Sequence, residues 1–521
     1  MNTPARFLLA ALLAWAGAAQ AASLTWSFSS DIQTLDPHSS RISFTNNLLG
    51  NIYEPLVRMN EKLEIEPALA QSWERPSPTV WRFRLRPGVK FQGGEAFSAA
   101  DVVFSFDRIR TPGGNLGALA AVQAMRAVDD LTLEIETARP FPILLNALLQ
   151  FPIMSRTWAE ANNAQAASNL TSQEQNYAGR QANGTGPFRV VSREGDGPTV
   201  LEAHRGWWDK PRHNLDRVTY LPIRNAATRT ASLLSGTTDA TVELPLQDVD
   251  RVRADPRLQV VQGPELRTIY LGMDHGRDEL LYSDVKGRNP FKDLRVRQAL
   301  YHAIDIQAIH RTTMRGQSVP TGTLFPEQVN GYVREEDVRL PYDQAKARAL
   351  LAEAGYPNGF SITLDCPNNR YINDEQICQA LTAMWARIGV RASLKSQPLA
   401  PFFAQIQRDD TSLYMLGWGV PTLDALYSFQ SLLASRGSAP GDGIWNFGRY
   451  ANPRMDALIA RMKTETGPAR QEAIREGLRL YREDIPQIPL HHQMIPWAMR
   501  KNVSIPHAAN NQPYFRWAAV D

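Results

Sequence analysis

One arginine near the middle of the chain lies in a segment suited to anion binding. Arg370 is part of CPNNRYIND, residues 366–374, and lies between the only two cysteines, Cys366 and Cys378. A guanidinium presents a planar fork of N–H donors that matches a carboxylate, and a loop already held in place loses little freedom on binding. We therefore predict that Arg370 binds a ligand carboxylate. The alternative is an ion pair with a neighbouring acid: Asp365, Asp374 or Glu375.

An aromatic ring between two glycines forms a second candidate. Gly417, Trp418 and Gly419 follow an apolar run. Flanking glycines expose the face of a tryptophan and let a ligand approach the backbone, so we predict that these three residues line a ligand site. A buried core tryptophan is the alternative. Trp445 and Phe447 are further candidates for lining the same site, with core packing as the alternative.

Signatures of catalysis are largely missing from the sequence. It has no His-Glu-x-x-His, no phosphate-binding glycine loop ending in Gly-Lys and no Gly-x-Ser-x-Gly. Residues 283–286 match Ser-x-x-Lys, but the companion Lys-Thr-Gly is absent. His491 and His492 are adjacent, and neighbours on a strand point to opposite faces, so they do not easily share one ion. We expect a binding protein rather than an enzyme, with no cofactor and no metal.

Charge and the first residues indicate where the protein works. The 56 basic and 53 acidic residues nearly balance, which gives no support for nucleic-acid binding. Residues 1–21 have the form of a secretory signal peptide, with Arg6, an apolar run and a small-x-small cleavage site. No cysteine lies near the predicted cleavage site, so we expect no lipid anchor. The sequence predicts a soluble, exported protein of a bacterial periplasm.

Exported proteins form disulfides, so the two cysteines predict one bond between Cys366 and Cys378. Two cysteines alone are a poor structural zinc site, which needs four ligands. The bond would join the end of an apolar strand, 360–364, to the first turns of a helix, 374–388. The loop that carries Arg370 would be closed between them.

The pattern of predicted strands and helices around these residues indicates a mixed α/β fold. With 521 residues the chain is too long for one core, so two or three domains are expected. Apolar residues alternate with arginines at 81–86, which predicts a strand, and Ser98 with Asp101 predicts a capping box before a helix through 109. Val89 to Phe91 reads as a short return strand. Further helices are predicted at 229–235, 293–314, 343–355 and 374–388.

Several segments resemble the peptide/nickel class of periplasmic solute-binding proteins that serve ABC importers. The segment 81–108 closely resembles a signature of this class, although Gln92-Gly93-Gly94 replaces the usual His-Asp-Gly. Other matching segments occur in the expected order: TLDP at 34–37, IYEPL at 52–56, NGTGPF at 183–188, NPFKDLRVRQALYHAID at 289–305 and NPRMD at 452–456.

The resemblance implies a two-lobe periplasmic-binding-protein-like fold with a hinge. We expect a discontinuous first lobe (22–54, 185–270 and 487–521), an extra subdomain on it (55–184) and a second lobe (271–486). In dipeptide binders of this class an arginine in the matching loop holds the peptide carboxylate, which supports Arg370, and the matching Gly-Trp lines the cleft. Permease subunits with cytoplasmic ATPases are the implied partners, and we expect a monomer.

The sequence departs from the class at one binding position. Peptide binders carry an aspartate there, which pairs with the α-ammonium of the peptide; here the residue is Pro421. Asp424 is a candidate substitute, with N-capping of the following helix as its alternative role.

The function predicted is capture of short peptides or peptide-like carboxylates for uptake. The alternative keeps the fold and changes the ligand to a nickel chelate, an opine or another small anion. A secreted hydrolase, and a periplasmic chaperone or sensor adaptor with the same fold, are more distant alternatives.

Overall fold

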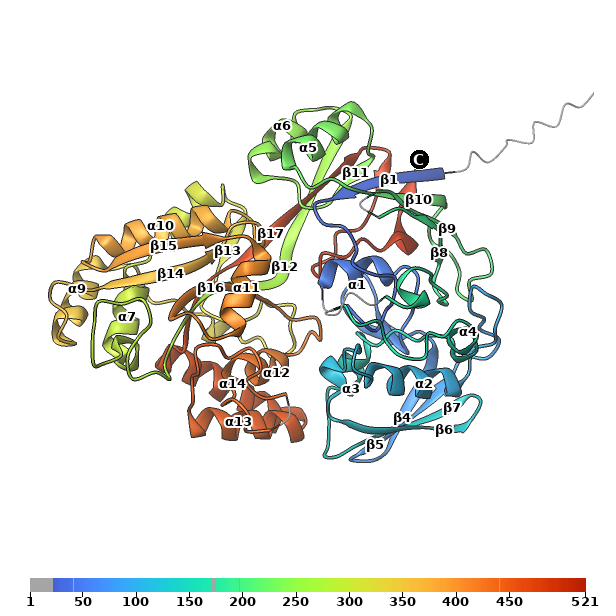
Figure 1. Ribbon diagram of the computed structural model, residues 1–521, viewed down its shortest axis with the longest axis horizontal. Coiled ribbons are helices and arrows are strands. Elements are labelled where there is room, and N and C mark those ends of the chain that lie inside the picture. The colour runs from blue at the N-terminus through green and yellow to red at the C-terminus, as the bar shows by residue number, and fades with distance from the viewer. Residues whose placement is uncertain (1–21, 41, 171–174, 196, 440) are drawn as a thin grey trace, which may run out of the picture.

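Two long strands run between the two halves of the molecule and join them (Figure 1). A computed structural model describes residues 22–521 except 41, 171–174, 196 and 440, so the predicted signal peptide lies outside the described residues. β12 (Leu258–Met273) and β17 (Gln487–Arg500) pair antiparallel from Leu258 opposite Arg500 to Gly272 opposite Gln487. They belong to an 11-stranded sheet in the order β15-β14-β16-β12-β17-β11-β1-β10-β9-β8, in which β13 pairs with β17.

The second lobe gathers on one side of these strands. Its strands are β13 (Ser318–Pro320), β14 (Ser361–Pro367), β15 (Arg391–Gln397) and β16 (Leu413–Gly419). Its helices are α7 (Leu294–His302), α8 (Ile306–Ala308), α9 (Gln344–Glu353), α10 (Asp374–Ala386), α11 (Leu399–Gln407), α12 (Ala425–Ser428), α13 (Pro453–Thr464) and α14 (Gly467–Asp484).

The first lobe lies on the other side. Its strands in the large sheet are β1 (Ala22–Phe28), β8 (Phe188–Arg193), β9 (Thr199–Ala203), β10 (Leu215–Pro222) and β11 (Ala240–Thr241). Its helices are α1 (Ser43–Leu49), α5 (Ala226–Ser235) and α6 (Val249–Arg253), and β18 (Val503–Ser504) pairs with β19 (Ala519–Val520).

A separate four-stranded sheet lies below the first lobe in Figure 1. Its order is β4 (Ala70–Ser77), β5 (Val80–Leu85), β7 (Thr132–Thr137) and β6 (Val122–Asp129). The same region holds β2 (Val57–Met59), β3 (Ile65–Pro67), α2 (Ala99–Ile109), α3 (Leu144–Leu148) and α4 (Arg156–Ala161). The mixed α/β, two-lobe architecture expected from the sequence is therefore present.

Local sequence signals placed several of the predicted elements correctly. The predicted strand at 81–86 is β5, with Trp81, Phe83 and Leu85 buried, and Ser98 and Asp101 form the predicted capping box of α2. Gly236 ends α5 in a left-handed conformation that glycine adopts at little cost. The predicted strand at residues 89–91 is wrong, because only an isolated bridge between Lys90 and Ala96 forms there.

The predicted helix at 293–314 is divided in the structure. α7 ends at His302, and Asp305 then begins α8 by accepting a hydrogen bond from the backbone N–H of Ala308. The apolar spacing continues across this break, because residues of both pieces pack into the same core of the second lobe. Periodicity therefore identified the buried face but not the interruption.

A buried ion pair fastens the smaller sheet region to the first lobe. Arg108, near the end of α2, donates to both carboxylate oxygens of Asp36 at 2.7 and 2.6 Å, and both side chains are fully buried. Burial alone would raise the pKa of Asp36, but the hydrogen bonds and charge of Arg108 lower it to about 2. The aspartate of the TLDP segment therefore has a structural role.

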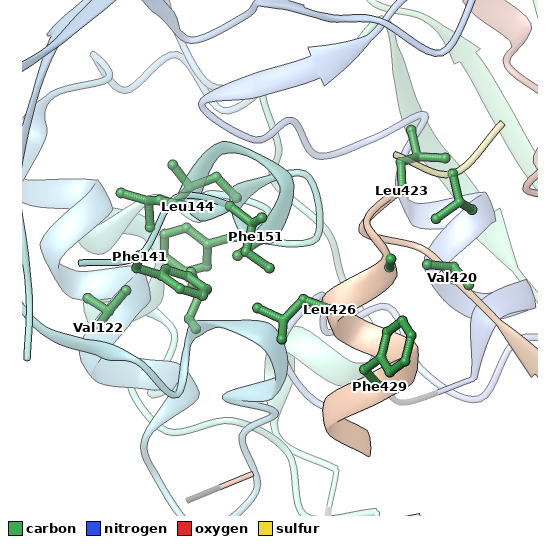
Figure 2. Close-up of a cluster of buried hydrophobic side chains, with 14 of the residues drawn as sticks. Val122, Phe141, Leu144, Phe151, Val420, Leu423, Leu426 and Phe429 are labelled. Atoms are coloured by element: carbon green, nitrogen blue, oxygen red, sulfur yellow. The ribbon is translucent and has the colours of Figure 1, made fainter. Parts of the chain in front are cut away.

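The two lobes contact each other through apolar side chains at the end away from the long strands (Figure 2). Val122, Phe141, Leu144 and Phe151 come from the region of the four-stranded sheet, and Val420, Leu423, Leu426 and Phe429 come from the second lobe; all eight belong to one buried cluster. The side chain of Asn146 also donates to the carbonyl oxygen of Thr422 at 2.7 Å. The structure thus shows the lobes in contact.

The predicted boundary at 270 falls inside the continuous strand β12. Residues 258–264 of β12 pair with residues 494–500 of β17, the part of that strand that also pairs with β11. Residues 267–273 of β12 pair with β16 of the second lobe. The other domain bounds stay predictions. Within the described part of the chain, no helix is long and apolar enough to cross a membrane.

Candidate ligand-binding site

The loop that carries Arg370 is held by the structure on several sides. Asp374 accepts hydrogen bonds from the backbone N–H groups of Arg370 and Tyr371 at 2.9 and 3.0 Å. The side chain of Gln493, on β17, accepts from the N–H of Ile372 at 3.0 Å. These contacts fix the loop relative to both α10 and one of the long strands.

The predicted disulfide is confirmed. Cys366 at the end of β14 and Cys378 in α10 are bonded and fully buried, with their Cα atoms 6.6 Å apart. The bond closes the chain around the arginine loop, across a sequence separation of 12 residues. It adds a covalent restraint to the hydrogen bonds that already hold Arg370.

We expect the double change Cys366→Ala and Cys378→Ala to lower the free energy of unfolding by about 3 kcal/mol, the chain-entropy value for a loop of this length. Chemical denaturation with and without a reducing agent measures it. The double variant in oxidising buffer should match the reduced wild type. Equal stability of oxidised wild type and double variant would contradict the prediction.

The guanidinium of Arg370 has no acceptor among the described residues. The acids named as structural partners are otherwise engaged: Asp374 accepts from backbone N–H groups, and Asp365 accepts from Gln405 and Thr411. The guanidinium carbon lies 5.1 Å from the centre of the Tyr371 ring. Burial first, and repulsion from Arg267 second, lower its pKa. The predicted alternative, an ion pair between Arg370 and a neighbouring acid, is not observed. The guanidinium therefore makes no hydrogen bond to a carboxylate in the described structure.

An irregularity in the long strands places more charge beside this arginine. The β12–β17 register jumps between Pro264 and Thr268, so residues 265–267 lie opposite the single residue Gln493. A bulge of this kind redirects side chains. Arg267 donates to Glu265 at 3.1 Å, and Gln493 donates to the same carboxylate at 2.8 Å. Glu265 and Arg267 therefore neutralise each other at the junction of the lobes.

The first lobe contributes a second carboxylate. Glu243 follows β11 and has a left-handed backbone, with φ of 58°. Its side chain accepts a hydrogen bond from the amide of Asn511 at 2.8 Å. Burial first, and repulsion from Glu265 second, raise its pKa to about 7. The positive charges of three arginines oppose this rise in the pKa of Glu243: Arg370, Arg229 and Arg267. We call Glu243, Glu265, Arg267 and Arg370 the charged cluster.

One of the two glycines flanking Trp418, Gly417, makes room for Tyr371 and Arg267. A Cβ atom on Gly417 would lie 2.7 Å from Cε1 of Tyr371 and 3.0 Å from Cδ of Arg267. A Cβ atom on Gly419 would lie 3.7 Å from a guanidinium nitrogen of Arg267. Gly417 in particular lets the arginine loop pack directly on β16.

The prediction that Trp418 exposes its ring is wrong. Only 7% of Trp418 is exposed, because the ring stacks on Tyr427 at 5.0 Å and contacts Trp445 at 5.8 Å. Trp445 also packs against Phe447 at 5.6 Å. Neighbours on a strand face opposite ways, so Trp418 lies on the other face of β16 from the surface of Gly417 that Tyr371 covers. These aromatic residues form a core cluster.

Asp424 is also placed differently from its predicted ligand role. Its carboxylate is fully buried and accepts from both terminal guanidinium nitrogens of Arg470, at 3.0 and 2.6 Å. It also accepts from the side chain of Asn330 at 2.8 Å and from the N–H of Leu426, which makes it the N-cap of α12. No carboxylate oxygen is left for a ligand, so the capping alternative is confirmed.

A cavity lies between the first lobe and the region below it. It is lined by residues of α1 and by His38, Arg58, Phe151 and Arg516, and none of the predicted ligand residues belongs to it. Its edge includes Gln512, next to the residue that donates to Glu243. The cavity and the charged cluster therefore share one short segment of chain.

Sequence reasoning selected Arg370 as a candidate but did not identify its charged neighbours. Gly263 and Pro264 interrupt an otherwise strand-like segment. This interruption could have predicted the bulge that carries Glu265 and Arg267. No local pattern marks Glu243.

Comparison with known proteins agrees with this architecture. Residues 64–440 match the family model described as bacterial extracellular solute-binding proteins, family 5. The chain belongs to this family. Family 5 proteins capture solutes for ABC importers, so the resemblance inferred from the sequence is confirmed.

Individual members of the family are distant in sequence and close in fold. The glutathione-binding protein GsiB of Pectobacterium atrosepticum is 26% identical over 454 residues, which cover 85% of this chain and 83% of GsiB. MoaA from A. tumefacien R10, solved with mannopinic acid, is 27% identical with a TM-score of 0.78, covering 96% of this chain and 99% of MoaA. DppA from Helicobacter pylori, solved with the peptide STSA, has 23% identity and a TM-score of 0.80, covering 96% and 98%.

Proposed function

We propose that this family 5 protein captures a short peptide or peptide-like carboxylate in the periplasm and presents it to an ABC permease with cytoplasmic ATPases. The observation that carries the proposal is Arg370, whose guanidinium has no acceptor in the described structure although its loop is fixed by a disulfide and hydrogen bonds. Arg370 is only partly buried, and a ligand carboxylate would give its guanidinium the charge-assisted hydrogen bonds that the described residues do not supply.

The protein acts by binding and release, without covalent chemistry. β12 and β17 join the lobes beside Glu265 and Arg267, so a ligand held by Arg370 of the second lobe would lie close to the junction of the two lobes. A ligand favours the closed state only as much as it binds that state better than the open one. The signal peptide would be cleaved on export, and the mature protein would work as a monomer.

A non-peptide ligand is the second candidate. Pro421 and the engaged carboxylate of Asp424 leave the second lobe without the aspartate that peptide binders use for an α-ammonium. MoaA was solved with mannopinic acid, and NikZ from Campylobacter jejuni, which has the same fold, with Ni(L-His). Both candidates require Arg370 to hold an anionic group.

A thermal-shift screen tests the proposal. The probes are dipeptides, tripeptides including glutathione, mannopinic acid and nickel–histidine, with mass spectrometry of any molecule that co-purifies from the native host. We expect at least one carboxylate-bearing probe to raise Tm and to be recovered intact. A flat response to every probe, with no co-purified ligand, would contradict the proposed function, and a cleaved probe would contradict the absence of chemistry.

A further inference from the structure

The cavity between the first lobe and the region of the four-stranded sheet, which we call the first-lobe cavity, has the size of a small-molecule site. Its volume is about 140 Å³, and a protein cavity of about 150 Å³ takes a molecule of the size of benzene. The described residues that line it lie within the segments 37–59, 109–119, 147–152 and 512–516, so none of them comes from the second lobe. Its walls therefore form without the second lobe, and Arg370 is not among them.

Most of the wall is apolar. Five buried side chains on it are Leu49, Met59, Ile109, Leu119 and Phe151. No aspartate or glutamate is among the described residues that line the cavity. An apolar wall with a few polar groups is the usual lining of a small-molecule site. The first-lobe cavity therefore suits an apolar body, and no acidic side chain on its wall would repel an anion.

One guanidinium on this wall lacks an anionic partner. Arg516 is only 8% exposed, and its Nη2 donates to the carbonyl oxygen of Met59 at 2.8 Å. Its Nε is buried without an acceptor, and no carboxylate among the described residues pairs with it. The rings of Tyr514 and Trp517 hold the guanidinium carbon at 4.6 and 4.2 Å from their centres. A buried cation held in place with unused donors is preorganised to bind a carboxylate.

The other basic groups on the wall carry no unmatched charge. Arg58 donates to Glu66 at 2.8 Å and to Asp209 at 2.6 Å. Burial lowers the pKa of His38 to about 4, so this imidazole is neutral at pH 7. Burial lowers the pKa of Arg516 only to about 10, so its guanidinium stays charged. A ligand in the first-lobe cavity would therefore meet one unmatched positive charge.

We propose that the first-lobe cavity is a second ligand site that binds a small amphipathic monocarboxylate, with the carboxylate on Arg516 and the apolar body against Leu49, Met59 and Phe151. This site goes beyond the proposed function, because it is independent of the carboxylate capture assigned to Arg370. One unpaired guanidinium favours a single negative charge, and an acid with one aromatic ring matches the volume of the cavity.

Titration calorimetry with acid and amide pairs tests this inference. The probes are benzoate with benzamide, and phenylacetate with phenylacetamide; the members of each pair share their shape and differ in charge. We expect the wild type to bind at least one acid with a stoichiometry of one, and about tenfold or more tightly than its amide, because only the acid forms charge-assisted hydrogen bonds.

Variants of the guanidinium make the test specific. In Arg516→Met, which keeps an apolar stem, the preference for the acid should fall below about threefold, and Arg516→Lys, which keeps the charge without the planar fork, should lie between. Arg205→Met, at an arginine whose side chain is 87% exposed, should bind both probes as the wild type does. The comparison of acid and amide on the wild type needs no substituted protein, so it decides even if Arg516→Met folds poorly.

Arg370→Ala separates this site from that of the transported ligand. An acid bound in the first-lobe cavity should bind this variant as tightly as the wild type. Loss of binding there would place the acid at Arg370 and overturn the inference while supporting anion capture. Failure of both acids to bind, equal binding of acid and amide, or an unchanged preference in Arg516→Met would also overturn it, and these three results leave the proposed function to the separate screen of peptides and opines.

Discussion

Arg370→Ala is expected to weaken binding of a carboxylate-bearing ligand by about 30-fold or more. Removing one partner of a desolvated charge pair costs about 2–5 kcal/mol, and about 1.4 kcal/mol corresponds to tenfold in affinity. The loop around the change should keep its conformation, because its fixed points are backbone N–H groups and the disulfide rather than the guanidinium. Titration calorimetry with the best probe of the screen measures the loss.

Two variants make this test specific. Arg370→Lys keeps the charge but not the planar fork, so it should lie between wild type and alanine. Arg387→Ala removes an exposed arginine just beyond the opposite end of α10, roughly 20 Å along that helix at 1.5 Å per residue, and should not change affinity. Wild-type affinity in Arg370→Ala, with Tm unchanged, would exclude Arg370 from the site and with it the main support for carboxylate capture.

Asp424→Ala is expected to destabilise the fold by about 3–5 kcal/mol without a selective effect on the ligand. The change leaves the guanidinium of Arg470, which is only 5% exposed, without its carboxylate and removes the N-cap of α12. Urea denaturation measures the loss. Affinity measured well below Tm should match the wild type, because the carboxylate lies in the interior of the second lobe.

A second change tests the cause of this destabilisation. Arg470→Met in the Asp424→Ala background removes the stranded charge and should restore part of the stability, since an apolar replacement for both partners avoids the unpaired buried ion. Asp107→Ala, at an exposed aspartate of α2, should stay within about 0.5 kcal/mol of wild type. If Asp424→Ala kept full stability and lost ligand affinity, the structural role assigned here would be wrong.

The features predicted correctly from sequence are those decided within a few residues. The alternation at β5, the Ser98–Asp101 capping box and the left-handed Gly236 each depend on neighbours along the chain. The disulfide was predictable because the chain has only two cysteines and the signal peptide predicts an oxidising compartment. The family segments identified the two-lobe fold for the same reason: each is a short, continuous run.

The errors share a different cause. Trp418 was expected to be exposed because glycines flank it, but Gly417 instead accommodates Tyr371 and Arg267 on the other face of β16. From the sequence, Asp424 could be either an N-cap or a ligand-binding residue. The structure shows that its carboxylate accepts a hydrogen bond from Arg470, which lies 46 positions later in the chain. In both cases the environment of the residue is set by side chains that are distant in the sequence and that folding brings into contact with it.

The sequence by itself determined the family and the disulfide-closed arginine loop, and it predicted the compartment and the kind of ligand group that Arg370 would hold. Only the tertiary structure decided that this guanidinium has no hydrogen-bonded carboxylate in the described structure, and that Glu265 and Arg267 pair with each other nearby. The physical reason is range. Hydrogen-bonded caps, turns and periodic burial act over a few residues, whereas the balance of a buried charge depends on every charge that folding brings near, and the bulge in β12 and β17 brings these together from segments far apart in the chain.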